Sequence, residues 1–293
     1  MLGNTTLAHY SVAELADYID WTPFFSAWEL RGKFPEILTD SVVGEAATAL
    51  YSDARAMLDR IIADDVLRPE AVVGLWPANA DGDDIIVYTD DTRSEQRAVF
   101  HTLRQQRVKQ DDAPNLALAD FIAPRGVPDY IGGFVVTAGV SEDEIADRFK
   151  EAGDDYSSIM VKALADRLAE AFAERLHQRV RTEFWGYAPD ENLTGAQLLG
   201  EQFVGIRPAP GYPSQPDHTE KETLFRLLEC GARVGVKLTE SMAMWPGASV
   251  CGMYFGHPKS RYFGVGSIGP DQVKDYAQRK RWDITEAEKW LVV

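Results

Sequence analysis

Cysteine is scarce in this sequence, and no long apolar run occurs. Only Cys230 and Cys251 are found among the 293 residues, too few for a disulfide framework and without the spacing of a zinc site. We interpret both cysteines as structural. No apolar stretch approaches the length of a membrane span, and the N-terminus lacks the basic and apolar segments of a signal peptide. These absences predict a cytoplasmic protein that does not enter a membrane.

Positive charge is also in short supply. The sequence holds 30 Lys and Arg against 46 Asp and Glu, a formal net charge of −16, so neither nucleic acid nor an anionic membrane is predicted as a partner. Two short basic clusters, at residues 104–109 and 279–281, lie near predicted helix ends, where cations complement the helix dipole. Docking of an acidic partner protein is the alternative for either cluster. The five histidines form no ligand pair, so no metal site is predicted.

Helical periodicity is strongest in two segments. Apolar residues recur three or four positions apart over residues 41–64 and again over residues 156–185, where Gly186 marks the stop. The second segment predicts one long central helix. Shorter helices are predicted after the capping-box sequences that begin at residues 92, 141, 219 and 285, and after Pro270.

Short apolar runs predict the strands. Residues 72–76 and 85–88 are predicted as the arms of an antiparallel hairpin around Asp81-Gly82, and further strands are predicted at residues 116–122, 130–140, 248–255 and 261–268. The last two would be joined by a hairpin loop. Helices do not alternate regularly with these strands, which favours an α+β fold with antiparallel sheets over a Rossmann fold. No repeat or linker interrupts the sequence, so residues 1–293 are predicted to form a single domain.

A glycine-rich run near the C-terminus matches a dinucleotide-binding pattern. Residues 264–269 read GxGxxG between a predicted strand and a predicted helix. A βαβ unit needs a second parallel strand after that helix, and no strand-like run remains before Val293. We therefore interpret the run as a decoy, whose small residues let a flat group lie close to the backbone. A Gly-x-Ser-x-Gly nucleophile elbow does not occur.

The most informative stretch is residues 207–213, with the sequence RPAPGYP. Its three prolines remove three backbone donors and forbid a helix interior or a central strand, which predicts a rigid wall. Gly211 would let a ligand approach the main chain. Tyr212 offers a flat face with a hydroxyl, and Arg207 offers a planar fork suited to a carboxylate. An ordinary proline-rich surface turn is the alternative interpretation.

One carboxylate lies among aromatic residues. Asp20 sits within the aromatic segment IDWTPFF at residues 19–25, which would bury it at least partly, so it needs a partner. The partner is either a cationic ligand or the first turn of a following helix. The sequence alone favours the helix cap.

Taken together, six blocks of sequence resemble one known family. They lie in order at residues 18–25, 72–79, 160–174, 205–213, 218–221 and 237–250, and the resemblance covers nearly the whole chain. It is to the C-terminal activation domain of cobalamin-dependent methionine synthase, which binds S-adenosylmethionine. The resemblance implies a single curved α+β unit with the ligand in a shallow groove.

The resemblance also implies which residues hold the amino acid end of the ligand. Asp20 would bind its ammonium and Arg207 its carboxylate, while the backbone around Tyr262 and Phe263 would contact it too. A zwitterion calls for one carboxylate and one guanidinium, so the chemistry of these residue types agrees.

Further residues are implied at the rest of the ligand. Glu170 and Glu201 resemble the acidic contacts of the family on the ribose side, and Tyr212 would lie near the sulfonium, where π density suits a cation. Ala209 and Gly211 complete the implied binding set along the proline-rich wall.

The activity implied by the resemblance is reactivation of oxidised cobalamin. An electron from a flavoprotein, a flavodoxin or a diflavin reductase, returns the cobalamin to a state that takes a methyl group from S-adenosylmethionine. Such a displacement needs alignment rather than an acid or base, so no catalytic residue is assigned. Two alternatives remain, a noncatalytic S-adenosylmethionine-binding adaptor that regulates a corrinoid protein and a free-standing methyltransferase.

The sequence departs from the complete enzyme in what it omits. The Asp-x-His-x-x-Gly signature for cobalamin is absent, as are the cysteine ligands of the zinc that activates homocysteine. Cobalamin is therefore expected on a partner, the cobalamin-binding domain. This chain alone is not expected to make methionine.

Overall fold

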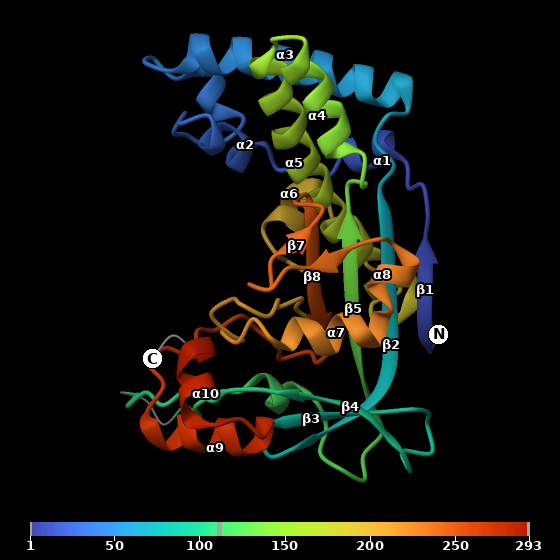
Figure 1. Ribbon diagram of the computed structural model, residues 1–293, viewed down its shortest axis with the longest axis vertical. Coiled ribbons are helices and arrows are strands. Elements are labelled where there is room, and N and C mark those ends of the chain that lie inside the picture. The colour runs from blue at the N-terminus through green and yellow to red at the C-terminus, as the bar shows by residue number, and fades with distance from the viewer. Residues whose placement is uncertain (1, 110–112, 292–293) are drawn as a thin grey trace.

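A six-stranded antiparallel sheet forms the frame of the fold (Figure 1). The structure is a computed structural model that describes residues 2–109 and 113–291. The sheet has the order β4-β3-β2-β5-β8, with β1 paired to β2 beside β3. Its strands are β1 (Gly3–Leu7), β2 (Glu70–Asp81), β3 (Asp84–Tyr88), β4 (Gln96–His101), β5 (Asp129–Thr137) and β8 (Ser249–Tyr254). A separate short pair joins β6 (Lys237–Leu238) to β7 (Met244–Trp245).

The two central strands are buried on both faces. Almost every residue of β2 and β5 is buried, which explains why both read as nearly continuous apolar runs rather than as alternating ones. Gly133 of β5 faces α7 (Glu220–Leu228), and a Cβ there would lie 2.5 Å from Leu224 Cδ1. A side chain at this position would force Leu224 to shift, so Gly133 serves the packing of α7 against the strand.

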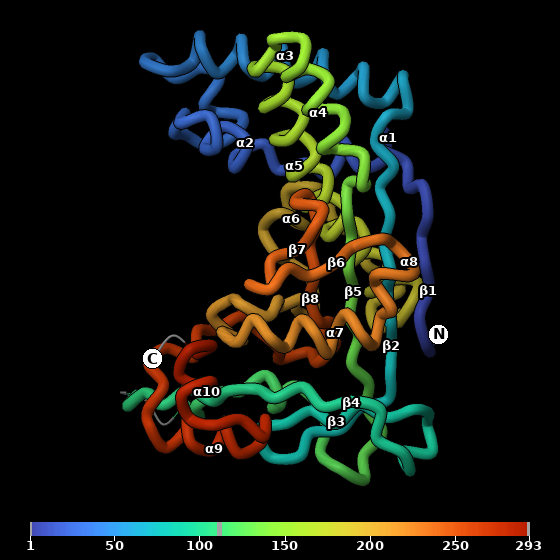
Figure 2. Tube along the Cα trace, in the orientation of Figure 1, coloured from blue at the N-terminus to red at the C-terminus, as the bar shows by residue number. Residues whose placement is uncertain are grey.

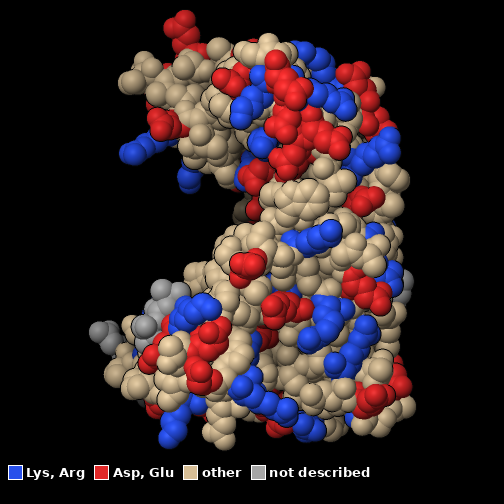
Figure 3. Space-filling model, viewed as in Figure 1, with Lys and Arg blue, Asp and Glu red and all other residues tan. Residues whose placement is uncertain are grey.

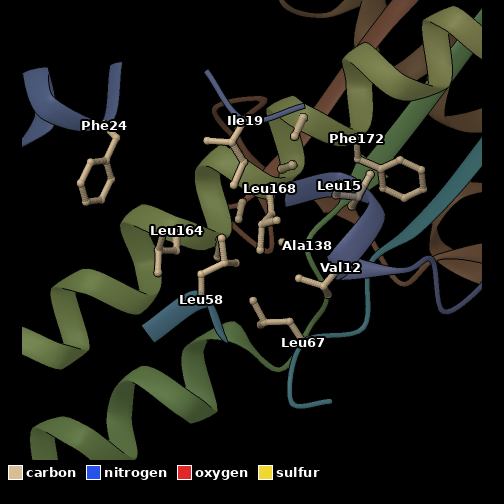
Figure 4. Close-up of a cluster of buried hydrophobic side chains, with 14 of the residues drawn as sticks. Val12, Leu15, Ile19, Phe24, Leu58, Leu67, Ala138, Leu164, Leu168 and Phe172 are labelled. Carbon is tan, nitrogen blue, oxygen red and sulfur yellow. The ribbon is translucent and has the colours of Figure 1, made fainter. Parts of the chain in front are cut away.

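Five helices pack together at one end of the sheet. They are α1 (Val12–Ala16), α2 (Trp21–Ala27), α3 (Gly44–Asp64), α4 (Glu142–Glu151) and α5 (Asp155–Arg179). Figure 4 shows Val12, Leu15, Leu164 and Leu168 directed into one shared interior, the largest hydrophobic core of the molecule. The long helix α5 continues past this core to contact β5 and β8. It is therefore the element that links the helical end to the sheet.

Shorter helices cover the rest of the molecule. They are α6 (Gly195–Leu199), α7, α8 (Cys230–Arg233), α9 (Pro270–Lys280) and α10 (Ile284–Leu291). Helix α9 is tied to the start of α7 because Lys280 Nζ lies 2.6 Å from Glu220 Oε1 and 3.0 Å from Asp217 Oδ2. All three side chains are almost fully buried, so this cluster fixes the C-terminal helices to the sheet.

The molecule is elongated and hollowed on one side. The Cα trace places α3 at one end and β3, β4 and α9 at the other, with β2 and β5 running between them (Figure 2). Figure 3 shows the surface indented between these two ends. The curved α+β fold expected from the sequence is confirmed, whereas the prediction of a single domain over residues 1–293 stays a prediction.

Most of the strong sequence signals are confirmed. The helices predicted over residues 41–64 and 156–185 are α3 and α5, the latter followed by a π-helical turn, Val180–Phe184, and by Gly186 at a φ of +73°. Helices also follow residues 141 and 219 and begin at Pro270. The predicted hairpin is β2 and β3, although β3 pairs with residues 78–81 of β2 rather than with residues 72–76.

Two predictions between residues 92 and 122 were wrong. The sequence Thr92-x-x-Glu95 opens no helix, because Thr92 bonds to Asp90 within a turn and the following residues form β4. Buried residues alternate in β4 at Ala98 and Phe100, the period of a strand. The basic residues at 104–109 therefore follow a strand instead of ending a helix. Residues 116–122 form no strand but contain a 3₁₀ turn, Leu118–Phe121.

Three predictions near the C-terminus were also wrong. Residues 261–268 form no strand, and residues 257–260 no hairpin loop, because the outer edge of β8 is taken by residues 206–208 instead. The last helix is capped by Asp283, whose Oδ1 accepts from the backbone N–H of Glu286 at 2.8 Å, and not by Thr285.

Candidate functional site

A cavity of about 890 Å³ lies between the proline-rich wall and the β6-β7 pair. The elements that carry its lining, among them α5, β7 and β8, lie between the two ends of the molecule (Figure 1). The lining is contributed by residues 207–210, 212–214, 241–244 and 249–251, together with Phe134, Glu170, Glu201, His218, Lys221, Tyr262 and Phe263. The cavity is large enough for a nucleoside-sized ligand.

The wall of residues 207–213 is fixed by hydrogen bonds to the sheet. Ile206 and Phe255 exchange backbone hydrogen bonds of 3.1 and 3.0 Å, and Met253 N–H donates to the Pro208 carbonyl at 2.9 Å. After Pro208 the prolines supply no further donors, so the chain turns away from β8. Gly211 sits in this turn at a φ of +95°, and a Cβ there would lie 2.3 Å from His218 Cε1. The wall is thus anchored to the edge of the sheet and is backed by an imidazole.

Arg207 lies at the base of the wall with its guanidinium held on two sides. Its Nη2 donates to Glu174 Oε2 at 2.6 Å, and its Nη1 donates to His177 Nδ1 at 3.1 Å. Its backbone N–H donates to the Tyr262 hydroxyl at 3.1 Å, which brings Tyr262 against the wall. The side chain of Arg207 is 19% exposed and lines the cavity. A largely buried cation at a cavity surface can bind a carboxylate with little loss to water.

Lys221 joins the two opposite walls of the cavity. Its Nζ donates to His218 Nδ1 at 3.0 Å, beneath the proline-rich wall, and to the Met242 carbonyl at 2.9 Å, on the opposite loop. Burial lowers the pKa of Lys221. Met242 has a φ of +62°, an uncommon conformation for a side-chain-bearing residue, and this hydrogen bond helps to hold it.

Seven of the nine residues predicted for the site line this cavity. They are Glu170, Glu201, Arg207, Ala209, Tyr212, Tyr262 and Phe263. Tyr212 and Tyr262 are 64% and 43% exposed, so both rings are accessible to a ligand. Gly211 belongs to the same wall but touches His218 rather than the cavity.

Asp20 is the exception. It caps α2, with its Oδ1 accepting from Thr22 N–H at 2.9 Å, so the helix cap that the sequence favoured is present. It does not line the large cavity. Its neighbour Ile19 instead lines a smaller cavity of about 270 Å³ together with Glu174, the partner of Arg207. Of the ion pair, Arg207 therefore lines the larger cavity and Glu174 the smaller one.

Sequence reasoning did not single out four residues that shape this site. Glu174 and His177 hold Arg207, while His218 and Lys221 hold the proline-rich wall. Glu174, His218 and Lys221 fall within blocks of family resemblance, which was the only signal that pointed to them. Their contacts join segments too far apart in the chain to be deduced from spacing.

The glycine-rich run forms no dinucleotide-binding unit, and the two cysteines are not reactive thiols. Residues 264–269 lead into α9 without a preceding strand, and α10 is the last element of the described chain, so no βαβ unit is formed. Cys230 and Cys251 are free and buried. Burial raises the pKa of Cys251 to about 12, which keeps the thiol protonated and unreactive.

Three of the six cations in the two basic clusters are paired within the chain. Arg104 pairs with Asp83 and Asp120, and Arg279 pairs with Asp84 and Asp275. With Lys280 bound in its buried cluster, these three cations serve the fold. Docking of an acidic partner by either cluster stays a hypothesis.

A search of residues 2–109 and 113–291 finds no group of His, Cys, Asp and Glu that could hold a metal ion. Within the same ranges, no helix combines the length and apolar character needed to cross a membrane.

Comparison with known proteins decides the family. A family model described as the activation domain of vitamin B12 dependent methionine synthase matches residues 11–281, a span that contains every residue lining the large cavity. The chain belongs to this family. The resemblance drawn from the sequence blocks is thereby confirmed.

A solved structure agrees with this assignment of the activation domain. A crystal structure described as the MetH reactivation domain bound to AdoHcy is 56% identical in sequence. The two structures superpose with a TM-score of 0.96, and the match covers 99% of this chain and 90% of the chain in the solved structure. The α+β fold without a Rossmann unit is therefore that of the reactivation domain.

Proposed function

We propose that this activation domain binds S-adenosylmethionine in the large cavity and supports the reductive methylation of cobalamin in methionine synthase. The observation that carries the proposal is the placement of Arg207, Tyr212 and two glutamates on one cavity. It is supported by the solved relative, which is described as bound to AdoHcy, the molecule that remains when S-adenosylmethionine loses its methyl group.

The donors on the cavity wall fit each part of this ligand. Arg207 presents N–H groups for the carboxylate, and the carboxylates of Glu170 and Glu201 accept from the ribose diol. The exposed ring of Tyr212 offers its face to the sulfonium, as aromatic rings do for other cations. Asp20 is assigned to the ammonium as the resemblance implies, although it does not line the large cavity.

The residues of this chain orient the ligand rather than react with it. The methyl group leaves the sulfonium sulfur, which becomes the thioether of S-adenosylhomocysteine, and this transfer requires no proton movement at a side chain. The acceptor would be supplied by a partner cobalamin-binding domain, whose cobalamin would need one electron from a flavodoxin or a diflavin reductase. The rigid wall and the fixed Arg207 contribute by holding the donor in line with that acceptor.

Calorimetric titration tests the binding step. We expect saturable binding of S-adenosylmethionine and S-adenosylhomocysteine and none of NADH. Arg207→Ala is expected to weaken binding by about 1.5 to 3 kcal/mol, the scale of a hydrogen-bonded charge pair. Binding of NADH alone would contradict the proposal, and unchanged affinity in folded Arg207→Ala would remove that residue from the site.

Reconstitution tests the transfer step. Methyl transfer is expected only when a cobalamin-binding domain and a reductant accompany the chain. Binding without transfer under these conditions would favour an adaptor that regulates a corrinoid protein, and transfer without cobalamin would favour a free-standing methyltransferase.

A further inference from the structure

Two buried residues of α5 hold the guanidinium of Arg207 and have no other role in the proposed function. Glu174 and His177 lie three positions apart, so they share one face of the helix. Glu174 Oε2 accepts from Arg207 Nη2 at 2.6 Å, and His177 Nδ1 accepts from Nη1 at 3.1 Å. The side chain of Glu174 is only 8% exposed, less than that of Arg207.

His177 is fixed in place by aromatic neighbours. It is fully buried, stacks on Tyr254 with ring centroids 5.0 Å apart, and meets Phe203 edge-on at 4.9 Å. Burial and the nearby cation of Arg207 lower the pKa of His177 well below its usual value. The imidazole is therefore neutral, and its Nδ1 is free to accept a hydrogen bond.

Glu174 supplies the only carboxylate in hydrogen-bonding contact with Arg207 among the described residues. Taking a guanidinium out of water is costly unless it is paired, so loss of this carboxylate would leave Arg207 free to turn toward solvent. With one hydrogen of each terminal nitrogen used, Arg207 keeps three N–H groups for a ligand.

We propose that Glu174 is a positioning residue that sets the specificity of this site for a ligand carboxylate by orienting Arg207. The inference rests on the proposed function, because it assigns the amino acid end of the ligand to Arg207. Glu174 lines the smaller cavity and not the larger one, so it acts through Arg207 rather than on the ligand.

Two adenosyl ligands separate this role from a structural one. S-Adenosylhomocysteine carries the amino acid end, whereas 5′-methylthioadenosine lacks it and shares the adenosine and the sulfur. In calorimetric titrations, Glu174→Gln is expected to weaken S-adenosylhomocysteine binding at least ~10-fold and 5′-methylthioadenosine binding less than ~2-fold. In an Arg207→Ala background, Glu174→Gln is expected to cause no further loss.

A second glutamate on the same stretch of chain provides the matched control. Glu183 pairs with Arg179 at 2.8 Å on the surface, so Glu183→Gln removes an ion pair of the same kind away from the cavity. It is expected to change the affinity for neither ligand. If Glu174→Gln does not fold, Glu174→Asp is used instead, because the shorter side chain withdraws the carboxylate from Arg207 by one methylene. Glu174→Asp is expected to weaken S-adenosylhomocysteine binding and not 5′-methylthioadenosine binding.

Three results would overturn the inference. One is an equal loss of affinity for both ligands in a folded variant, another is unchanged affinity for both, and the third is a further loss in the Arg207→Ala background. Failure of the unsubstituted chain to bind S-adenosylhomocysteine at all would instead refute the proposed function and the inference with it.

Discussion

Gly211→Ala tests whether the proline-rich wall is held from behind by His218. Gly211 has a φ of +95°, and a Cβ there would lie 2.3 Å from His218 Cε1 and 2.5 Å from Nδ1. The substitution therefore forces an alanine into a left-handed conformation and pushes the imidazole away. His218 would then lose its hydrogen bond from Lys221, which joins the two walls of the cavity.

The expected magnitude is the sum of two effects. A residue with a Cβ in the left-handed region costs about 1 to 2 kcal/mol. Overpacking against a fixed neighbour adds about 1 to 3 kcal/mol. The free energy of unfolding of Gly211→Ala is thus expected to fall by about 2 to 5 kcal/mol, and S-adenosylhomocysteine binding is expected to weaken because the wall moves.

A second glycine isolates the contact from the backbone effect. Gly126 has nearly the same φ, +93°, but a Cβ there would meet nothing within 4 Å. In urea unfolding, Gly126→Ala is expected to lower the free energy of unfolding only by the cost of the left-handed backbone. Combining Gly211→Ala with His218→Ala removes the clash, so the cost of Gly211→Ala in that background should fall to that of Gly126→Ala. If Gly211→Ala costs no more than Gly126→Ala in the unsubstituted background, the reasoning is refuted.

Three further predictions concern buried groups. Arg181 is fully buried and donates to Glu191 at 2.7 Å through two nitrogens. In urea titrations, Arg181→Met is expected to lower the free energy of unfolding by about 3 to 5 kcal/mol, because it leaves the carboxylate unpaired. Adding Glu191→Leu should restore much of the lost stability. Burial holds the pKa of His177 well below 6.5 in the folded chain, so below pH 6.5 the unfolded chain binds more protons than the folded one. The free energy of unfolding should therefore decrease as the pH is lowered, by at most about 1.4 kcal/mol per pH unit. His177→Gln should flatten this slope between pH 7 and 5. Cys230 and Cys251 are buried with raised pKa values, so iodoacetamide should modify them only after unfolding, as mass spectrometry would show.

The sequence predicts well what depends on neighbouring residues. The helix α5 follows from a 3.6-residue apolar period, and the wall at residues 207–213 follows from prolines, which act on their own backbone. Where two local signals compete, the prediction fails. The capping-box sequence at Thr92 predicted a helix where β4 forms. The alternation of buried residues at positions 98 and 100 of β4 depends on its pairing with β3, which the sequence alone does not show.

Contacts between distant segments account for the rest of the site. Glu174 and Arg207 are 33 residues apart, and nothing in their spacing shows that one orients the other. The same limit applies to Lys280 and Glu220, 60 residues apart, because one lysine of a cluster that reads as basic surface is held in a buried ion pair. The resemblance to the family named residues most of which line one cavity, but the side chains that support Arg207 had to be found from the fold.

The attachment of the wall to β8 has a consequence for how the molecule behaves at high concentration. An edge strand with free donors and acceptors recruits strands from other copies and so promotes aggregation. Residues 206–208 occupy part of this edge, through Ile206 and the carbonyl of Pro208. Pro208 and Pro210 have no N–H of their own, so their outer side offers no regular ladder to an incoming strand. The segment that shapes the ligand cavity thus also protects that part of the sheet against polymerisation by strand addition.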